Sequence, residues 1–112
     1  MPQLPGHQKK FLRGAAHALK AVVTVGQRGL TPAVVEALDA ALERHELVKV
    51  KFTGIKDRDR KGRLADEMAA AGQASLAGLI GHTAILYRRH PDPEKRRIVL
   101  PDRKGKASEE SG

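Results

Sequence analysis

The stretch Val22-Val23-Thr24-Val25-Gly26-Gln27-Arg28-Gly29-Leu30-Thr31-Pro32 carries the clearest structural signals in the chain. Its β-branched beginning predicts a short strand over residues 22–25. Thr31 suits the N-cap of a helix, and Pro32 suits the first helical position, where the missing amide costs nothing. The two glycines between these signals let the backbone turn tightly with positive φ. The stretch therefore predicts a strand, a glycine-flanked turn and a capped helix in direct succession.

Helical spacing extends on both sides of this stretch. Residues 8–20 are predicted to form a first helix, and its apolar face is Phe11, Leu12, Ala15, Ala16 and Leu19. The helix that begins at Thr31 has a predicted buried stripe of Val35, Leu38 and Leu42. A third helix is expected over residues 63–71, after a polar, turn-rich segment over residues 54–62.

The remaining strands follow from alternation and turn residues. Residues 47–53 alternate apolar and basic side chains, and residues 74–80 and 83–89 read as two strands joined at Gly81-His82. Residues 96–100 are expected to add a last extended piece. The predicted order is αβαβαββ, an α/β (α+β) sandwich with helices packed on one four-stranded mixed sheet. We expect one domain over residues 1–101 and a disordered polar tail over residues 102–112.

The composition limits the class of protein. The chain of 112 residues contains no Cys, which excludes disulfides and thiolate metal sites. No apolar stretch is long enough to span a bilayer or to serve as a signal peptide, so we expect a cytoplasmic protein without membrane contact. The net charge is +8, and residues 1–30 contain five Lys and Arg but no acidic residue. Such a field favours polyanionic partners.

The predicted first helix has a basic face opposite its apolar face, formed by Lys9, Lys10, Arg13, His17 and Lys20. Like charges without an acidic partner repel one another, and an anionic partner would neutralise them. A merely solvated face is the alternative interpretation. We interpret the face as part of a binding surface.

The loop Gly26-Gln27-Arg28-Gly29 is the second candidate binding element. It precedes a helix N-terminus, where free amides and the helix dipole favour an anion, and Arg28 can add a planar fork to a phosphate. A GXXG loop clamps backbone nucleotides in KH domains. A plain turn is the alternative. We expect the loop and the basic face of the first helix to form one continuous cradle for a polyanion.

No catalytic motif accompanies these elements. The chain has no phosphate-loop, GxGxxG, GxSxG or HExxH motif, and the calcium-loop-like segment from Asp57 fails at Lys61 and Met68. A second GxxG, Gly78 to Gly81, has apolar middle residues and is interpreted as a strand end. We therefore expect no enzyme, cofactor, metal or small-molecule substrate. Phe11 and Phe52 lie on predicted core faces, so Tyr87 is the only candidate for base stacking, and binding should depend on backbone charge.

Four stretches resemble the CRM domain (chloroplast RNA splicing and ribosome maturation) in its stand-alone bacterial YhbY-like form. They are residues 12–20, 25–31, 45–51 and 81–88, and the likeness covers about residues 8–100. The resemblance implies a domain similar to the C-terminal domain of translation initiation factor 3. It also implies RNA binding through the GxxG loop and neighbouring basic residues, and a role with precursor large ribosomal subunits.

The leading hypothesis is thus a monomeric RNA-binding protein that contacts ribosomal RNA and assists ribosome assembly. One alternative is a protein–protein adaptor on ribosomal particles, whose charge serves only solubility. Another is a DNA-binding domain that reads a groove with the second helix. The outer face of that helix is acidic, with Glu36, Asp39 and Glu43, and would repel phosphates.

Overall fold

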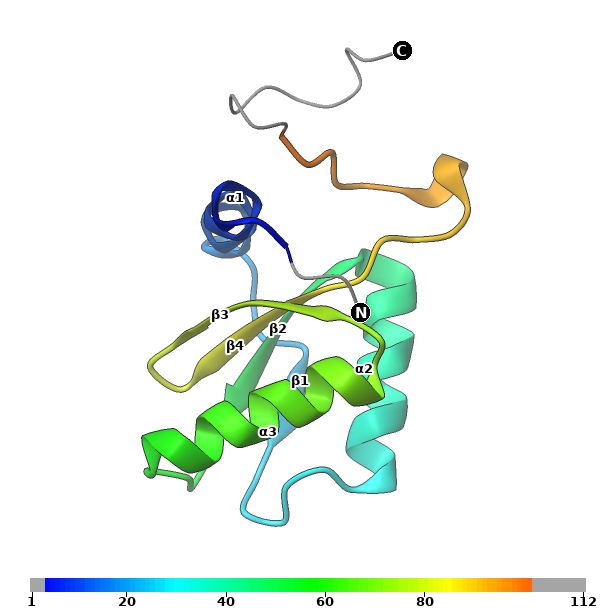
Figure 1. The fold of residues 1–112 in the computed structure, drawn as a ribbon. Coiled ribbons are helices and arrows are strands. Elements are labelled where there is room, and N and C mark those ends of the chain that lie inside the picture. Colours follow the sequence, from blue (N-terminus) through cyan, green and yellow to red (C-terminus); the bar gives the residue numbers. More distant parts are fainter. Residues whose placement is uncertain (1–3, 102–112) are drawn as a thin grey trace.

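The computed structural model describes residues 4–101, and the tail expected over 102–112 lies outside the described residues. A four-stranded sheet separates one helix on its first face from two helices on its second (Figure 1). The elements are α1 (Gly6–Ala16), β1 (Val23–Val25), α2 (Pro32–His45), β2 (Leu47–Phe52), α3 (Arg58–Ala71), β3 (Ser75–Ile80), β4 (Thr83–Tyr87) and a short 3₁₀ helix, η1 (Pro93–Lys95). The predicted order αβαβαββ and the mixed sheet are confirmed.

The sheet has the strand order β1-β2-β4-β3, in which β1 and β2 are parallel and the other pairs are antiparallel. Val25 lies opposite Phe52, and Lys51 lies opposite Thr83. The amide of Phe52 donates to the carbonyl of His82 over 2.8 Å. The segments 26–29, 53–57 and 81–82 therefore meet at one end of the sheet, which we call the loop end.

Two apolar cores hold the layers together. The larger core lies between the sheet and α2 and α3, and its largest fully buried members include Phe52, Leu38, Leu42 and Met68. The smaller core lies under α1 and is formed by Leu12, Ala16, Leu47, Ala77, Ile85 and Tyr87. Leu47 and Tyr87 face each other across β2 and β4, far from the loop end. α1 consequently covers the sheet from its middle to the end away from the loop end, which we call the opposite end.

The first helix is shorter than predicted, and this changes its apolar face. It ends at Ala16, where the amides of His17 and Leu19 turn back to the carbonyls of Gly14 and Ala16. Phe11 is 41% exposed and Leu19 is 39% exposed, so placing them on a core face was wrong. A helix that covers only part of a sheet needs only a narrow apolar stripe, and Leu12 and Ala16 form it.

Two further boundaries differ from the predictions. α3 begins at Arg58, five residues before the predicted start, because the Asp57 carboxylate accepts the amide of Asp59 over 2.9 Å and caps the helix. In α2, Val34 packs against the larger core and Val35 is only half-buried. Residues 96–100 belong to no strand. Two of them, Ile98 and Leu100, instead pack against the core under α1.

Candidate functional site

The glycine-flanked loop is a tight turn fixed by its own backbone. The amide of Gly29 donates to the carbonyl of Gly26 over 3.0 Å, and Gly29 has a φ of +72°. A Cβ at Gly29 would lie 3.3 Å from Cδ2 of Leu64 on α3, so both conformation and space require glycine here. The expectation of positive φ thus holds for Gly29 and not for Gly26.

Side chains tie the loop to its neighbours and leave one arginine free. The amide of the Gln27 side chain donates to the carbonyl of Gly54 over 2.9 Å, and the Arg60 guanidinium donates to the carbonyl of Gln27. Arg28 is exposed, and its side chain makes no hydrogen bond or ion pair within residues 4–101. Directly after the loop, the Thr31 hydroxyl accepts the amide of Val34 over 3.2 Å and caps α2, as predicted. The result is an unpaired guanidinium on a rigid turn at a helix N-terminus.

Sequence reasoning did not assign other cations that the fold places at the loop end. They are exposed Lys and Arg side chains on β2, on the segment after it and on α3, namely Lys51, Lys56, Arg58 and Arg63. Asp57 and Asp59 lie among them and moderate the charge. The signal for Lys51 was present in the alternation of β2. Arg58 was missed on α3, because residues 54–62 were predicted to be a turn-rich segment before a helix over residues 63–71.

The basic residues of the first helix do not act as one free face. Lys10 and His17 are exposed and Lys9 is half-buried, while Lys20 lies beyond the end of α1 in the linker to β1. Arg13 turns toward the sheet, where its guanidinium donates to the carbonyl of Ala77 over 3.0 Å. A Cβ at Gly78 would lie 2.6 Å from Cδ of Arg13, so this side chain packs on the bare glycine.

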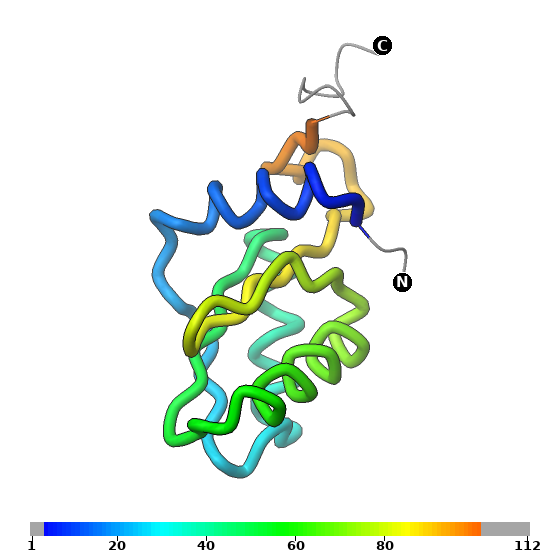
Figure 2. Tube along the Cα trace, turned by 60° about the vertical axis from the view of Figure 1, so that its left-hand side comes forward, coloured from blue at the N-terminus to red at the C-terminus, as the bar shows by residue number. Residues whose placement is uncertain are grey.

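The loop and the first helix lie at different ends of the molecule, as both views show (Figures 1 and 2). The α1 core is built on Leu47 and Tyr87, whereas the loop follows Val25 at the loop end. The expectation that the loop and the helix form one continuous cradle was therefore wrong. The surface between them is the α1 side of the strands.

That intervening surface is also cationic. Lys49 donates from Nζ to the carbonyl of Leu19 over 3.0 Å, which places its side chain on the α1 side of β2. Lys51, two residues further, shares this side, and Thr24 lies beside it on β1. Lys51 and Thr24 are exposed. Lys20, Lys49 and Lys51 thus lead from the end of α1 toward the loop end.

Acidic residues are absent from the elements that form this surface. Every Asp and Glu within residues 4–101 lies on α2 or α3, at one of their caps, or in the segment 92–94. α1 and the four strands carry none. α1, the linker 17–22 and the α1 side of the strands therefore form a face whose own elements carry positive charge only, whereas α2, α3 and the segment around η1 carry both signs. We call this face the acid-free face: α1, the linker 17–22 and the α1 side of β1–β4.

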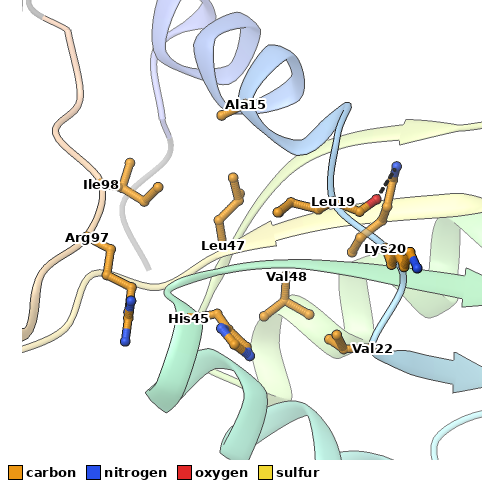
Figure 3. A pocket seen from close by; sticks show the side chains of 10 residues that line it. Ala15, Leu19, Lys20, Val22, His45, Leu47, Val48, Arg97 and Ile98 are labelled. Carbon is orange, nitrogen blue, oxygen red and sulfur yellow. Dashed lines mark hydrogen bonds between the residues drawn. The ribbon is translucent and has the colours of Figure 1, made fainter.

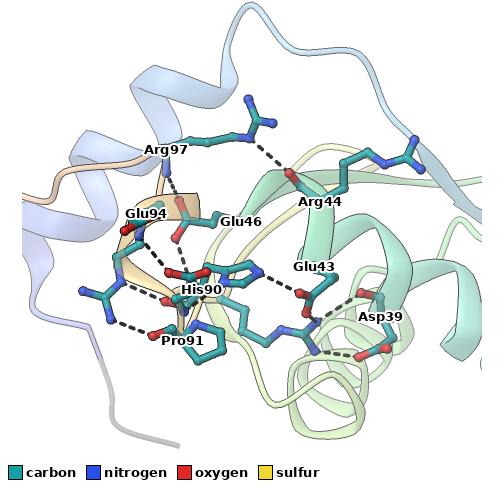
Figure 4. Close-up of polar contacts among 11 residues, drawn as sticks. Asp39, Glu43, Arg44, Glu46, His90, Pro91, Glu94 and Arg97 are labelled. Atoms are coloured by element: carbon teal, nitrogen blue, oxygen red, sulfur yellow. Dashed lines mark hydrogen bonds and ion pairs between the residues drawn. The ribbon is translucent and has the colours of Figure 1, made fainter.

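The charged groups near the end of α2 are engaged with one another (Figure 4). Glu46, only 1% exposed, accepts the backbone amides of His90, Arg97 and Ile98. His90 contacts Glu43 through Nε2 over 2.6 Å and accepts the amide of Asp92 at Nδ1. Arg88 lies 3.7 Å from Glu43, and we call Glu46, Glu43, His90 and Arg88 the Glu46 cluster. Since its polar atoms bind the C-terminal segment to α2, we interpret it as structural.

Two further features limit the chemistry. Tyr87 is 5% exposed, so it offers no stacking platform, and its burial raises the pKa of its hydroxyl, with the Glu46 carboxylate acting in the same direction. Within residues 4–101, no group of three or more His, Cys, Asp or Glu side chains could hold a metal ion. No helix in the described part of the chain is long and apolar enough to cross a membrane.

Comparisons with known proteins agree with this architecture. The family model of the CRS1 / YhbY (CRM) domain matches residues 4–88. A "Probable RNA-binding protein" of Pseudomonas aeruginosa is 40% identical over 92 residues, which cover 82% of this chain and 88% of the relative. An "RNA-binding protein" of Haemophilus influenzae is 40% identical over 101 residues, which cover 90% and 98%. The solution structure of a hypothetical protein from Staphylococcus aureus superposes with a TM-score of 0.75 at 30% identity, covering 88% of this chain and 99% of that one.

Proposed function

Because this chain belongs to the CRS1 / YhbY (CRM) domain family, we propose that it is a cytoplasmic RNA-binding protein that acts by binding rather than by catalysis. Its target in this proposal is structured ribosomal RNA in precursors of the large ribosomal subunit, whose assembly it assists. Relatives that cover most of the chain are named RNA-binding proteins, which supports the RNA partner.

The observation that carries the proposal is that the elements of the acid-free face contain basic residues and no acidic residue. The acid-free face offers Lys10, Lys20 and Lys51 without an acidic neighbour on the same elements, and Arg28 stands unpaired at the adjoining loop end. A duplex or hairpin presents phosphates along an extended backbone, so separate cations at the two ends of one face can contact one RNA. The proposal therefore keeps RNA binding by both the loop and the first helix, and it adds the lysines of β2 that lie between them.

The mode of binding follows from the aromatic residues. Phe52 and Tyr87 are buried and Phe11 is half-exposed on α1, so the sheet lacks the ring pair on which RRM-type domains stack bases. Phosphate contacts would thus supply most of the affinity, with little dependence on sequence.

A salt titration tests the proposal directly. We expect the affinity for a structured ribosomal RNA fragment to fall steeply with salt, with a log–log slope of about −0.7 to −0.9 for each neutralised phosphate. Arg28→Ala should weaken binding to all sequences alike and reduce the slope by about one contact. Lys95→Ala removes the same charge from exposed η1, where Lys95 lines a hollow together with Asp39 and Glu43 of α2, and should leave both quantities unchanged. A flat salt response of the unaltered protein would refute the proposal.

Two competition experiments separate the alternatives. Duplex DNA of matched length should compete poorly, because Glu36 is exposed on the outer face of α2, where a groove-reading helix needs neutral or basic residues. Association with precursor ribosomal particles should be lost after mild RNase treatment. Association that survives RNase and high salt would instead identify a protein–protein adaptor.

A further inference from the structure

An apolar pocket opens where the end of α1, the linker to β1 and the beginning of β2 meet (Figure 3). Its volume is about 350 Å³. The wall consists of aliphatic side chains from four segments of the chain: Ala15, Leu19, Val22, Leu47, Val48 and Ile98. Leu19 and Val22 are 39% and 53% exposed, so apolar surface remains open to solvent here.

The pocket exists because β1 is shorter than the strand beside it. β1 has three residues, and its first partner on β2 is Val50, so residues 47–49 extend beyond it. Even-numbered residues of β2 bond to β4, as the donation from Phe52 to His82 shows. Leu47 therefore turns its backbone polar groups toward the side where β1 is missing, whereas the carbonyl of Lys49 is occupied by the amide of Val22.

The rim of the pocket is cationic. Four basic side chains complete its lining, Lys20, His45, Lys49 and Arg97, and no acidic residue takes part. Lys49 is held by the carbonyl of Leu19, and Arg97 donates from Nε to the carbonyl of Arg44 over 3.1 Å. Lys20 and His45 are exposed. An occupant that is apolar in the middle and anionic at its edge would satisfy both the wall and the rim.

Resting on the proposed function, we propose that this pocket takes a single unpaired nucleotide of the bound RNA. The base would enter between the aliphatic side chains, its edge within reach of the Leu47 backbone, and its phosphate would lie on Lys20 and Lys49. Imidazole and guanidinium planes stack on bases, and His45 and Arg97 provide one of each. The pocket adjoins the acid-free face, so an RNA bound there can reach it.

The size of the pocket favours a nucleotide over an acidic amphipathic helix. A volume of 350 Å³ is at the lower end of small-ligand sites. A docked helix needs anchor pockets from i to i+7, which requires a groove about 10 Å long. One compact pocket matches one ring with its phosphate.

The test compares two RNA hairpins that share the same stem, one fully paired and one with a single bulged nucleotide. The unaltered protein should bind the bulged hairpin about tenfold more tightly. Ala15→Leu narrows the pocket from the exposed surface of α1 without altering charge, and should bring this ratio to about one. The affinity for the paired hairpin and the salt slope should stay as they were. Ala18→Leu adds the same bulk at an exposed residue that does not line the pocket, and should preserve the preference.

Three other outcomes would contradict the assignment of the pocket to a nucleotide, and they can be told apart. Equal affinities of the unaltered protein for the two hairpins, with a steep salt dependence, would overturn the pocket assignment and leave the proposed function standing. Failure to bind either hairpin would overturn both. An acidic peptide that binds the unaltered protein but not Ala15→Leu, with no preference between hairpins, would assign the pocket to a protein partner instead.

Discussion

The loop end and the Glu46 cluster are both rich in charged side chains but use them differently. In the cluster, Arg88 contacts Asp39 over 2.7 Å and donates to the carbonyl of Gly72, and Glu46 accepts three amides. At the loop end, Arg28 and Lys51 have no partner within the described residues. Charges that hold the fold are thus satisfied inside the chain, and charges available to a partner are left without one. Substitutions should affect stability at the first region and binding at the second.

The largest effect is expected from Glu46→Ala. The change leaves the buried amide of His90 and the partly buried amides of Arg97 and Ile98 without their carboxylate acceptor, and each unsatisfied donor costs about 1–3 kcal/mol. Glu46 also has a φ of +64°, a strained backbone conformation that these bonds help to maintain. We expect the free energy of unfolding to fall by about 3–5 kcal/mol, measured as a lower urea midpoint with an unchanged slope.

Glu36→Ala is the matched control for this prediction. It removes a carboxylate of the same kind from the exposed surface of α2 and should change stability by less than about 0.5 kcal/mol. Glu46→Gln should fall between the two, because one amide oxygen can replace only one of the two carboxylate oxygens in use. Equal stabilities of Glu46→Ala and Glu36→Ala would show that the cluster does not hold the fold.

The contrast between the two regions also explains what the sequence could predict. Elements with local signals were identified, such as α2 with its Thr31 cap and β2 with its alternation. The Glu46 cluster was not, because its carboxylate meets amides 44 to 52 residues away in the chain. Arg13 was assigned to a binding face, since nothing in the first helix reveals that Gly78 would leave room for its side chain. Long-range pairing of this kind leaves no periodic trace.

The next prediction concerns the two arginines that the sequence treated alike. Arg13→Ala should lower the free energy of unfolding by about 1 kcal/mol, because it loses the bond to the Ala77 carbonyl and the packing on Gly78. Gly78→Ala should cost a similar amount, since its Cβ displaces the Arg13 side chain. The double variant should be less stable than either single variant by no more than about 0.5 kcal/mol, because the two substitutions remove the same contact.

Arg28→Ala is the control for Arg13→Ala and should leave the urea midpoint unchanged. Additive losses in the double variant would show that Arg13 and Gly78 act independently, and that packing on Gly78 is not what makes Arg13 stabilising. An Arg13→Ala variant as stable as Arg28→Ala would instead place Arg13 with the free charges.

The smallest effect is expected from Tyr87→Phe, and only in alkaline solution. Burial raises the pKa of the Tyr87 hydroxyl above its ordinary value of 10.0, with the Glu46 carboxylate adding to the shift and Arg89 and Arg96 opposing it. Above about pH 10 the unfolded chain releases this proton while the folded chain retains it, so stability falls as pH rises through the folded pKa. Below the ordinary pKa the group is protonated in both states and contributes no pH dependence.

The unaltered protein should therefore lose more stability than Tyr87→Phe above pH 10, in urea titrations at stepped pH. Lysine titration is common to both proteins and cancels in the difference, and the single tyrosine lets tyrosinate absorbance follow the same proton directly. Stability curves that remain parallel through the alkaline range would mean that Tyr87 is open to solvent. The core under α1 would then be less tightly packed around this side chain than its burial in the structure indicates.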